Sequence, residues 1–215
     1  MMAPIAAFAT IVSVNGPASN LGAFAEIIDA PADVREDASF NMAQQGFDEV
    51  QDYTLLTDLA VDDGSIVAGL TVDSHMIYLN TGPGHDMTVA NQFGVAWIFS
   101  GDILGVMSNR SGSLEINSNS ALGAPGTIYP DASFNLRGLE GNHWDDSGCS
   151  ADCYNVVGDT LYLSMWVSEP GDWIRVVTLS DTITLPVPRV DVPTPTTLLL
   201  FGLGLAGAGL RRRAR

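Results

Sequence analysis

The sequence predicts an all-β fold, namely a single antiparallel β-sandwich of jelly-roll-like topology followed by a short C-terminal hydrophobic helix. Two observations support this prediction. From Glu26 onwards, apolar and β-branched runs alternate with Gly, Asn, Asp, Ser and Pro, a texture typical of sandwiches and barrels. Helical periodicity is nearly absent from the same region. We therefore assign one β-sandwich domain to residues 26–185.

Seven segments of the domain have the composition of strands. In one of them, SHMIYLN, Met76 and Tyr78 alternate with His75, Ile77 and Leu79, and we expect the histidine to be packed or hydrogen-bonded. The Glu-Pro-Gly-Asp sequence between LYLSMWV and WIRVVTL predicts a hairpin, because Pro and Gly favour a turn. The seven predicted strands are Tyr53–Leu59, Ser65–Leu70, Ser74–Asn80, Val89–Phe99, Ile103–Ser108, Thr160–Val167 and Trp173–Leu179.

Helix is expected in only two places, at Ala38–Gln45 and in the C-terminal apolar run. The segment Leu114–Pro130 is expected to be a long loop with one turn of helix. Residues 186–195 belong to a Pro-rich stretch that disfavours both helix and central strand, so we expect an extended spacer there.

Residues 1–25 resemble a signal peptide in part. The run Ile5–Val14 has about the length of a signal h-region, and Ala23-Phe24-Ala25 has the small-x-small pattern of a cleavage site. Cleavage after Ala25 is therefore expected, although no Lys or Arg precedes the apolar run. The alternative is an ordinary first strand or helix of the domain.

Charge is distributed very unevenly along the chain. The whole chain has a formal net charge of −16. All 25 acidic residues lie between Glu26 and Asp191, against five arginines in that span, a balance of −20. Such a surface repels phosphate backbones, so we exclude nucleic acid as a partner. Acidic side chains favour solubility, and cation binding is the alternative role.

The two cysteines, Cys149 and Cys153, lie close together in GCSADCY. In an exported chain, two cysteines predict one disulfide that closes a small loop. A zinc site that adds His143 is the alternative, although two cysteines alone are too few for a closed site.

No pattern in the chain indicates a catalytic, cofactor-binding or metal-binding site. There is no G-x-S-x-G elbow, P-loop, Rossmann fingerprint or H-E-x-x-H sequence. We therefore predict no catalytic residues, no cofactor and no metal. Two alternatives stay open: a module that binds Ca²⁺ or carbohydrate, and a secreted hydrolase that uses two carboxylates. The residues for the first alternative are Trp144 for stacking on sugars, and Asp145, Asp146 and Asp152, or Asp62 and Asp63, for Ca²⁺.

The C-terminal run Thr196–Leu210 contains no charged residue and ends at Arg211, Arg212 and Arg213. A helix of this length spans roughly 22 Å, short of the bilayer core of about 30 Å. We assign a transmembrane helix to residues 196–210 and a basic tail to residues 211–215. The arginines act as a positive-inside stop, which places the domain outside the cytoplasm.

The three-part order of this tail resembles the PEP-CTERM sorting signal of Gram-negative bacteria. The sorting motif is Val192, Pro193, Thr194 and Pro195, with Thr194 where family members usually have Glu. The resemblance implies transient binding by exosortase, anchoring in the inner membrane and then removal of the tail. It also implies export to the cell surface or extracellular matrix, often alongside exopolysaccharide. The body resembles uncharacterised members of the same secreted set in VDSHMIYLNT and EPGDWIRVV.

These observations predict a non-enzymatic, exported protein of the surface or extracellular matrix, sorted and processed by exosortase. The possible exopolysaccharide partner follows from the resemblance alone.

Overall fold

The computed structural model describes residues 10–36, 38–82, 89–133, 137–140, 152–168 and 171–180. Within these ranges the chain is mostly β, with several antiparallel sheets and one short helix. The predicted all-β class is therefore confirmed at this level. The chain divides into two units, Met1–Ile183 and Thr184–Arg215, and all described residues belong to the first. The expected C-terminal helix lies outside the described residues.

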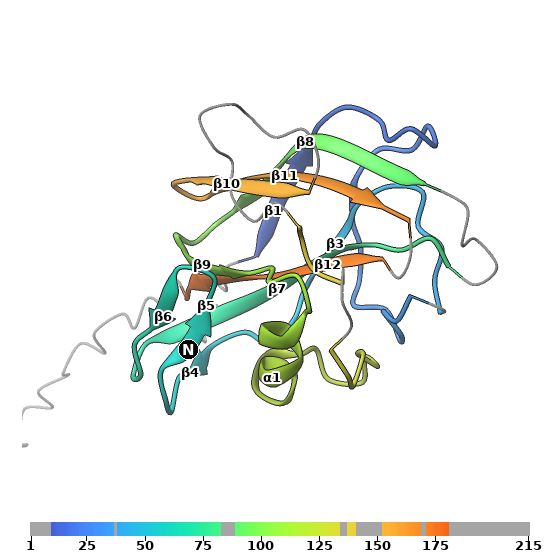
Figure 1. Ribbon diagram of the computed structural model, residues 1–215. Coiled ribbons are helices and arrows are strands. Elements are labelled where there is room, and N and C mark those ends of the chain that lie inside the picture. The colour runs from blue at the N-terminus through green and yellow to red at the C-terminus, as the bar shows by residue number, and fades with distance from the viewer. Residues whose placement is uncertain are drawn as a thin grey trace, which may run out of the picture. The chain divides into compact units, whose positions relative to one another are not determined.

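The first sheet has four antiparallel strands in the order β1-β8-β11-β10, coloured from blue to orange in the upper part of Figure 1. Alternate residues of β11 face the core, so that Leu161, Leu163, Met165 and Val167 are all buried. The strands are β1 (Ile11–Asn15), β8 (Ala90–Phe99), β10 (Cys153–Val157) and β11 (Thr160–Val167).

The second sheet has the order β2-β3-β7-β12-β9, and β4 also pairs with β7. Its pairs are antiparallel except for β2 with β3. A separate hairpin joins β5 to β6. The strands are β2 (Glu26–Ile27), β3 (Gln45–Asp48), β4 (Tyr53–Thr54), β5 (Leu59–Val61), β6 (Gly64–Ile66), β7 (Thr71–Leu79), β9 (Ile103–Met107) and β12 (Asp172–Leu179).

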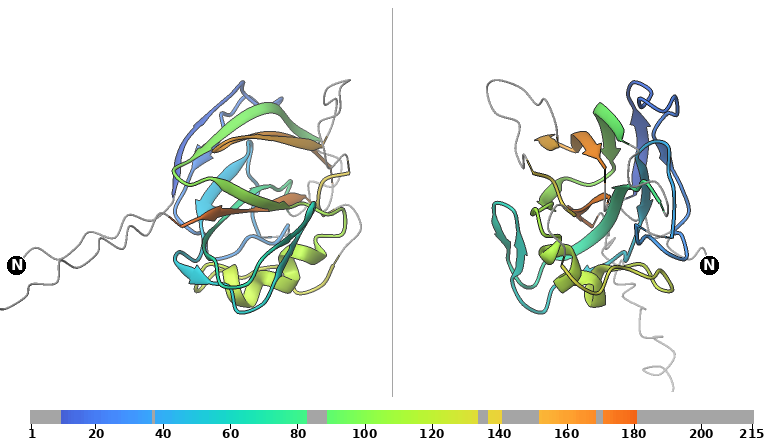
Figure 2. Two further views of the ribbon diagram at one scale, coloured as in Figure 1. Left: turned by 90° about the vertical axis from the view of Figure 1, so that its left-hand side faces the viewer. Right: turned by 45° about the vertical axis from the view of Figure 1, so that its right-hand side comes forward.

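The largest core cluster takes side chains from both sheets, which form two layers in Figures 1 and 2. Trp97 of the first sheet is fully buried there, with Ile77 and Val176 of the second. Gly46 is needed opposite the indole, because a Cβ at this position would lie 2.4 Å from the Trp97 ring. Apolar burial contributes roughly 25 cal/mol per Å², so this shared cluster is what holds the two layers together.

The helix α1 (Ser113–Leu122) covers the other face of the second sheet. Leu122 packs with Val72, Met107 and Val177, while the loop after the helix contributes to a third cluster with Met76. Strand β7 is therefore buried on both faces. This explains why apolar residues occur in both alternating sets, with Met76 and Tyr78 in one and Ile77 and Leu79 in the other.

The predicted strands at residues 74–80, 89–99, 103–108, 160–167 and 173–179 are confirmed as β7, β8, β9, β11 and β12. The segment 53–59 is not one strand but contains β4 and the start of β5, and only the start of 65–70 is a strand, as part of β6.

The helix predicted at Ala38–Gln45 was wrong, and so was the loop predicted at Leu114–Pro130. Residues 38–44 form no helix, because their polar side chains bond to neighbouring strands: Asn41 Nδ2 donates to Tyr78 O at 3.0 Å, and Gln44 Nε2 donates to Gln92 O at 3.1 Å. In contrast, the segment expected to be mainly loop contains the ten-residue helix α1. Its first turn is supported by Asn109, whose Oδ1 accepts from Leu114 N at 2.9 Å.

The predicted hairpin was also wrong. Strand β11 pairs with β8 and β10 in the first sheet, whereas β12 pairs with β7 and β9 in the second. The chain therefore crosses from one layer to the other between these strands. Burial of apolar side chains favours this crossing, because β11 and β12 face each other across the core cluster that the two layers share.

Part of the segment expected to be a signal peptide contributes to the fold. Residues Ile11–Asn15 form strand β1, which pairs with β8, and Ile11 is 6% exposed in the shared core. Leu21 and Ala25 also pack against this core. Cleavage after Ala25 would remove strand β1, and cleavage there stays a prediction.

Candidate functional site

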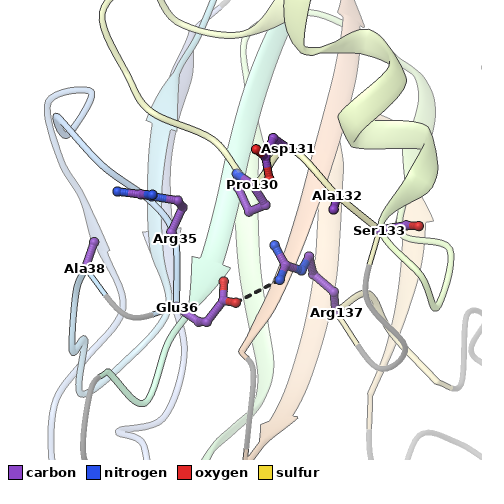
Figure 3. A pocket seen from close by; sticks show the side chains of 8 residues that line it. All are labelled: Arg35, Glu36, Ala38, Pro130, Asp131, Ala132, Ser133 and Arg137. Atoms are coloured by element: carbon purple, nitrogen blue, oxygen red, sulfur yellow. Dashed lines mark hydrogen bonds and ion pairs between the residues drawn. The ribbon is translucent and has the colours of Figure 1, made fainter.

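A hollow of about 380 Å³ lies between the chain segments near Arg35 and near Pro130. Figure 3 shows the side chains that line it. The hollow is lined by two arginines and two acidic residues, whereas acidic residues greatly outnumber arginines in the domain as a whole. The lining residues are Arg35, Glu36, Ala38, Pro130, Asp131, Ala132, Ser133 and Arg137.

Backbone hydrogen bonds hold the two walls of this hollow together. Val34 N donates to Ile128 O at 3.0 Å, and Ile128 N donates to Ala32 O at 2.9 Å. On the inner side, Asn80 Nδ2 donates to the carbonyl oxygens of Val34 and Arg35 at 3.0 and 3.2 Å. Because Asn80 directly follows β7, these bonds attach the walls of the hollow to the C-terminal end of this strand.

Three of the four charged residues that line the hollow, Arg35, Glu36 and Arg137, form ion pairs. Arg137 Nη2 donates to Glu36 Oε1 at 2.8 Å, as the dashed line in Figure 3 marks. Arg35 Nη2 lies 2.6 Å from Asp33 Oδ2, and the hydrogen bond from Arg35 lowers the pKa of Asp33. The same contact raises the pKa of Arg35. A ligand in this hollow would have to compete with the Arg137–Glu36 bond, and the hollow contains no aligned nucleophile and base.

A second polar centre is buried between α1 and the second sheet. Arg175 and Glu49 have no exposed side-chain area, and Nε and Nη2 of the arginine donate to the two carboxylate oxygens at 2.6 and 2.8 Å. The remaining donors bond to Glu115 O, Ser118 Oγ and Asn119 Oδ1. All five donors of the guanidinium are thus used. Because its partners come from both α1 and the sheet, this centre attaches the helix to the sheet.

Glu115 lies beside this centre with its side chain fully buried. Neither of its carboxyl oxygens has a hydrogen-bond partner. Burial raises the pKa of Glu115 to about 8, and the charges of Asp62 and Glu49 act in the same direction, although Arg175 opposes them. The carboxyl is therefore largely protonated at neutral pH.

Three further carboxyl groups, those of Glu140, Asp152 and Asp172, lie close to one another. Burial raises the pKa of Asp152 to about 8, and its hydrogen bond with Glu140 adds to the shift. Burial and the charges of Asp152 and Glu140 raise the pKa of Asp172 well above the usual value. Within the described ranges, no group of three or more His, Cys, Asp and Glu is placed to hold a metal ion.

Few of the sequence-predicted site residues can be placed. Cys153, in β10, is disulfide-bonded, and its predicted partner Cys149 lies outside the described residues. The motif Val192–Pro195 and the stop Arg211–Arg213 lie outside them as well, as do Trp144, Asp145 and Asp146. Among the described residues, no helix has the length and apolarity needed to cross a membrane.

Two further residues considered in the sequence analysis, His75 and Asp62, are hydrogen-bonded inside the domain. His75 is buried as predicted, with Nδ1 at 2.7 Å from Asp48 Oδ1 and Nε2 at 3.0 Å from Thr178 Oγ1. Asp62 is not a free loop carboxylate, since it accepts from Ser108 Oγ at 2.7 Å and from Tyr154 Oη at 3.1 Å.

Sequence reasoning missed both the hollow and the Arg175–Glu49 pair. One signal for the pair was available. Arg175 is the single charged residue inside the apolar run WIRVVTL, and a charge in a buried strand requires a partner.

Comparison with known proteins identifies the tail alone. Residues 191–213 match the family model of the PEP-CTERM protein-sorting motif. No curated protein and no solved structure matches the chain. The predicted resemblance of the tail is therefore confirmed. The motif implies a sorting signal targeted by exosortase, with export and a membrane-anchored C-terminal signal before processing.

Proposed function

We propose that this chain is a non-enzymatic protein of the cell surface or extracellular matrix, delivered there by exosortase. The observation that supports this proposal is the PEP-CTERM match at residues 191–213. According to this proposal, exosortase binds the motif Val192–Pro195 and removes the tail. The run Thr196–Leu210 anchors the precursor as a transmembrane helix, with Arg211–Arg213 on the cytoplasmic side.

The non-enzymatic role is supported by the state of the charged groups in the domain. The carboxyl groups with strongly raised pKa values, those of Glu115, Asp152 and Asp172, are buried and are not among the residues that line the hollow. Inside the hollow, Glu36 is already bonded to Arg137. An acid–base pair needs two groups that reach one substrate, and this arrangement does not provide them.

We also propose that the domain is a β-sandwich of jelly-roll-like topology. The core cluster shared by the two sheets and the crossing of the chain between β11 and β12 support this assignment.

Mass spectrometry of the exported protein tests the sorting proposal. In a Gram-negative host with exosortase, we expect the exported form to lack residues 196–215, and the precursor to accumulate in the inner membrane when exosortase is deleted. The variant Pro193→Ala, Pro195→Ala should accumulate as precursor in the same way. The matched control is Pro186→Ala, Pro188→Ala, which removes two spacer prolines outside the motif and should be processed normally. An exported form with an intact Thr196–Arg215 segment would contradict the proposal.

A further inference from the structure

Among the described residues, no strand residue that points outward from the first sheet is charged, and at its rim lies the carboxylate of Asp159, which accepts from Thr160 Oγ1 at 3.0 Å. Register partners point to the same side of a sheet, and Leu161, Leu163, Met165 and Val167 of β11 point into the core. The intervening residues and their partners on β1, β8 and β10 therefore point outward. They are Val12, Ser13, Asn15, Asn91, Phe93, Ala96, Ile98, Cys153, Asn155, Val157, Thr160, Tyr162, Ser164 and Trp166. Cys153 and Ser164 are buried on this side, so the exposed surface is made by the other residues.

This neutrality is notable because the body of the protein has a balance of −20. The same face has three half-exposed aromatic side chains: Phe93 is 37%, Tyr162 is 39% and Trp166 is 49% exposed. By contrast, Trp97 and Trp173 are buried. We call this surface, made by the outward residues of β1, β8, β10 and β11, the aromatic face.

The register of the strands fixes where the three rings lie. Tyr162 and Trp166 are four residues apart on β11, roughly 13 Å along the strand. Leu163 pairs with Val95 and Met165 pairs with Gln92, so Phe93 and Gly94 lie opposite Ser164, between the two rings. The irregularity here is a bulge with Gly94 at φ 66°, and bulges re-aim side chains.

Neutral hydrogen-bonding groups surround the rings. Asn15, Ala96, Tyr162 and Asn155 form one row across all four strands, and both of these asparagines are exposed. Asn91 is the register partner of Trp166. Amide groups both donate and accept, so the face offers both kinds of bond without a net charge.

We propose that the aromatic face binds a neutral polysaccharide chain. A sugar ring presents an apolar C–H surface that stacks on an aromatic ring, and its hydroxyl groups both donate and accept hydrogen bonds. The face has both kinds of partner, spaced along β11 and across the four strands. This site is distinct from the acidic loops and from Trp144, which the sequence offered for sugar binding.

Charge and area favour this occupant over others. An anionic polymer would be repelled by the acidic body, and a cationic partner would bind the acidic surface rather than its neutral face. A stable dimer buries about 800 Å² per partner around an apolar centre, whereas the exposed apolar side chains of this face alternate with the neutral polar side chains of Ser13, Asn15, Asn91, Asn155 and Thr160. The proposal does not depend on removal of the tail.

Affinity electrophoresis of the full-length chain in detergent tests the proposal. Native gels contain hydroxyethyl cellulose, laminarin, galactomannan or dextran, with alginate as the anionic comparison. We expect at least one neutral polymer to retard the protein and alginate to have no effect. The variants Tyr162→Ala and Trp166→Ala should each weaken retardation at least about fivefold, while Trp166→Phe should keep most of it. The matched control is Leu56→Ala, because Leu56 is 82% exposed and lies off this face.

A second readout follows Trp166 directly. The polymer that retards the protein should reduce acrylamide quenching of tryptophan fluorescence, and Trp166→Phe should remove that protection. Equal unfolding midpoints will show that the variants are folded, as expected for exposed positions. The proposal is overturned if no neutral polymer retards the protein. It is overturned as well if both alanine variants are retarded as strongly as the wild-type protein. It is also overturned if sedimentation shows that the face joins two copies of the chain and that Trp166→Ala separates them.

Discussion

Glu115 shows how a single residue can make the stability of this domain depend on pH. Its carboxyl group is buried without a hydrogen-bond partner, and its pKa of about 8 lies above the ordinary value of 4.5. The folded state therefore binds a proton more tightly than the unfolded chain. The stability that this proton provides is complete below about pH 4.5 and is lost as pH rises towards 8.

We expect Glu115→Gln to flatten the pH dependence of unfolding. Wild-type protein should lose stability from pH 5 to pH 8, by at most about 1.4 kcal/mol per pH unit from this group. The amide has no charge to bury, so the variant should lose less over the same range. Part of the slope will remain, because Asp152 and Asp172 are shifted in the same direction.

Urea unfolding at a series of pH values measures this effect. Asp29→Asn is the control, since Asp29 is exposed. Identical slopes for wild type and Glu115→Gln would show that the Glu115 carboxyl is not buried as described.

At the level of elements, β1 has the largest consequence for the mature protein. It is an edge strand of the first sheet, and it also connects the layers, because Ile11 N donates to Asp48 Oδ1 of β3 at 3.0 Å. A domain without it would expose the edge of β8 and part of the shared core. We therefore expect the exported protein to keep residues 11–25.

A pair of neighbouring substitutions tests the place of β1 in the core. Ile11 is 6% exposed, whereas Val12 is 57% exposed. We expect Ile11→Ala to lower the free energy of unfolding by about 2–4 kcal/mol, and Val12→Ala to change it by less than about 0.5 kcal/mol. Denaturant unfolding of the full-length chain measures both. Equal, small effects would mean that the segment is not part of the folded core and would restore the case for a leader.

The elements also show what the sequence could and could not predict. Long apolar strands such as β7, β8 and β12 were predictable because alternation and composition are local properties. The partner of β12 was not, because a turn sequence suits either a hairpin or a crossing between layers. The same limit hid the Arg175–Glu49 pair, whose members are 126 residues apart. The helix α1 was missed because its sequence, SLEINSNSAL, is rich in polar residues that favour turns.

The candidate surfaces were predictable only in part. The sorting motif is linear, so its sequence alone was sufficient to find it. The aromatic face is formed by residues from four strands that come from three separate regions of the chain, residues 11–15, 90–99 and 153–167. The register of the sheet was needed to bring its neutral residues together.

At the scale of the whole chain, the domain and the tail have opposite charge. Four of the nine arginines lie in the last five residues, while every acidic residue precedes the tail. Removal of residues 196–215 therefore changes the formal net charge from −16 to −20, since four arginines are lost and no acid is. The processed protein is more acidic than its precursor, which increases its repulsion from anionic membranes.

The last prediction concerns the independence of the domain from its tail. All three core clusters lie within residues 10–180, and the boundary between the two units of the chain falls at Ile183. A chain that ends at Ile183 should therefore unfold within about 2 °C of the full-length chain, since less than about 0.5 kcal/mol of stability is at stake. Calorimetry of both forms in the same detergent measures this difference, and Ile11→Ala provides a control that must lower the midpoint in both. A clearly lower midpoint for the truncated chain would mean that the tail stabilises the domain and that its removal by exosortase would weaken the exported protein.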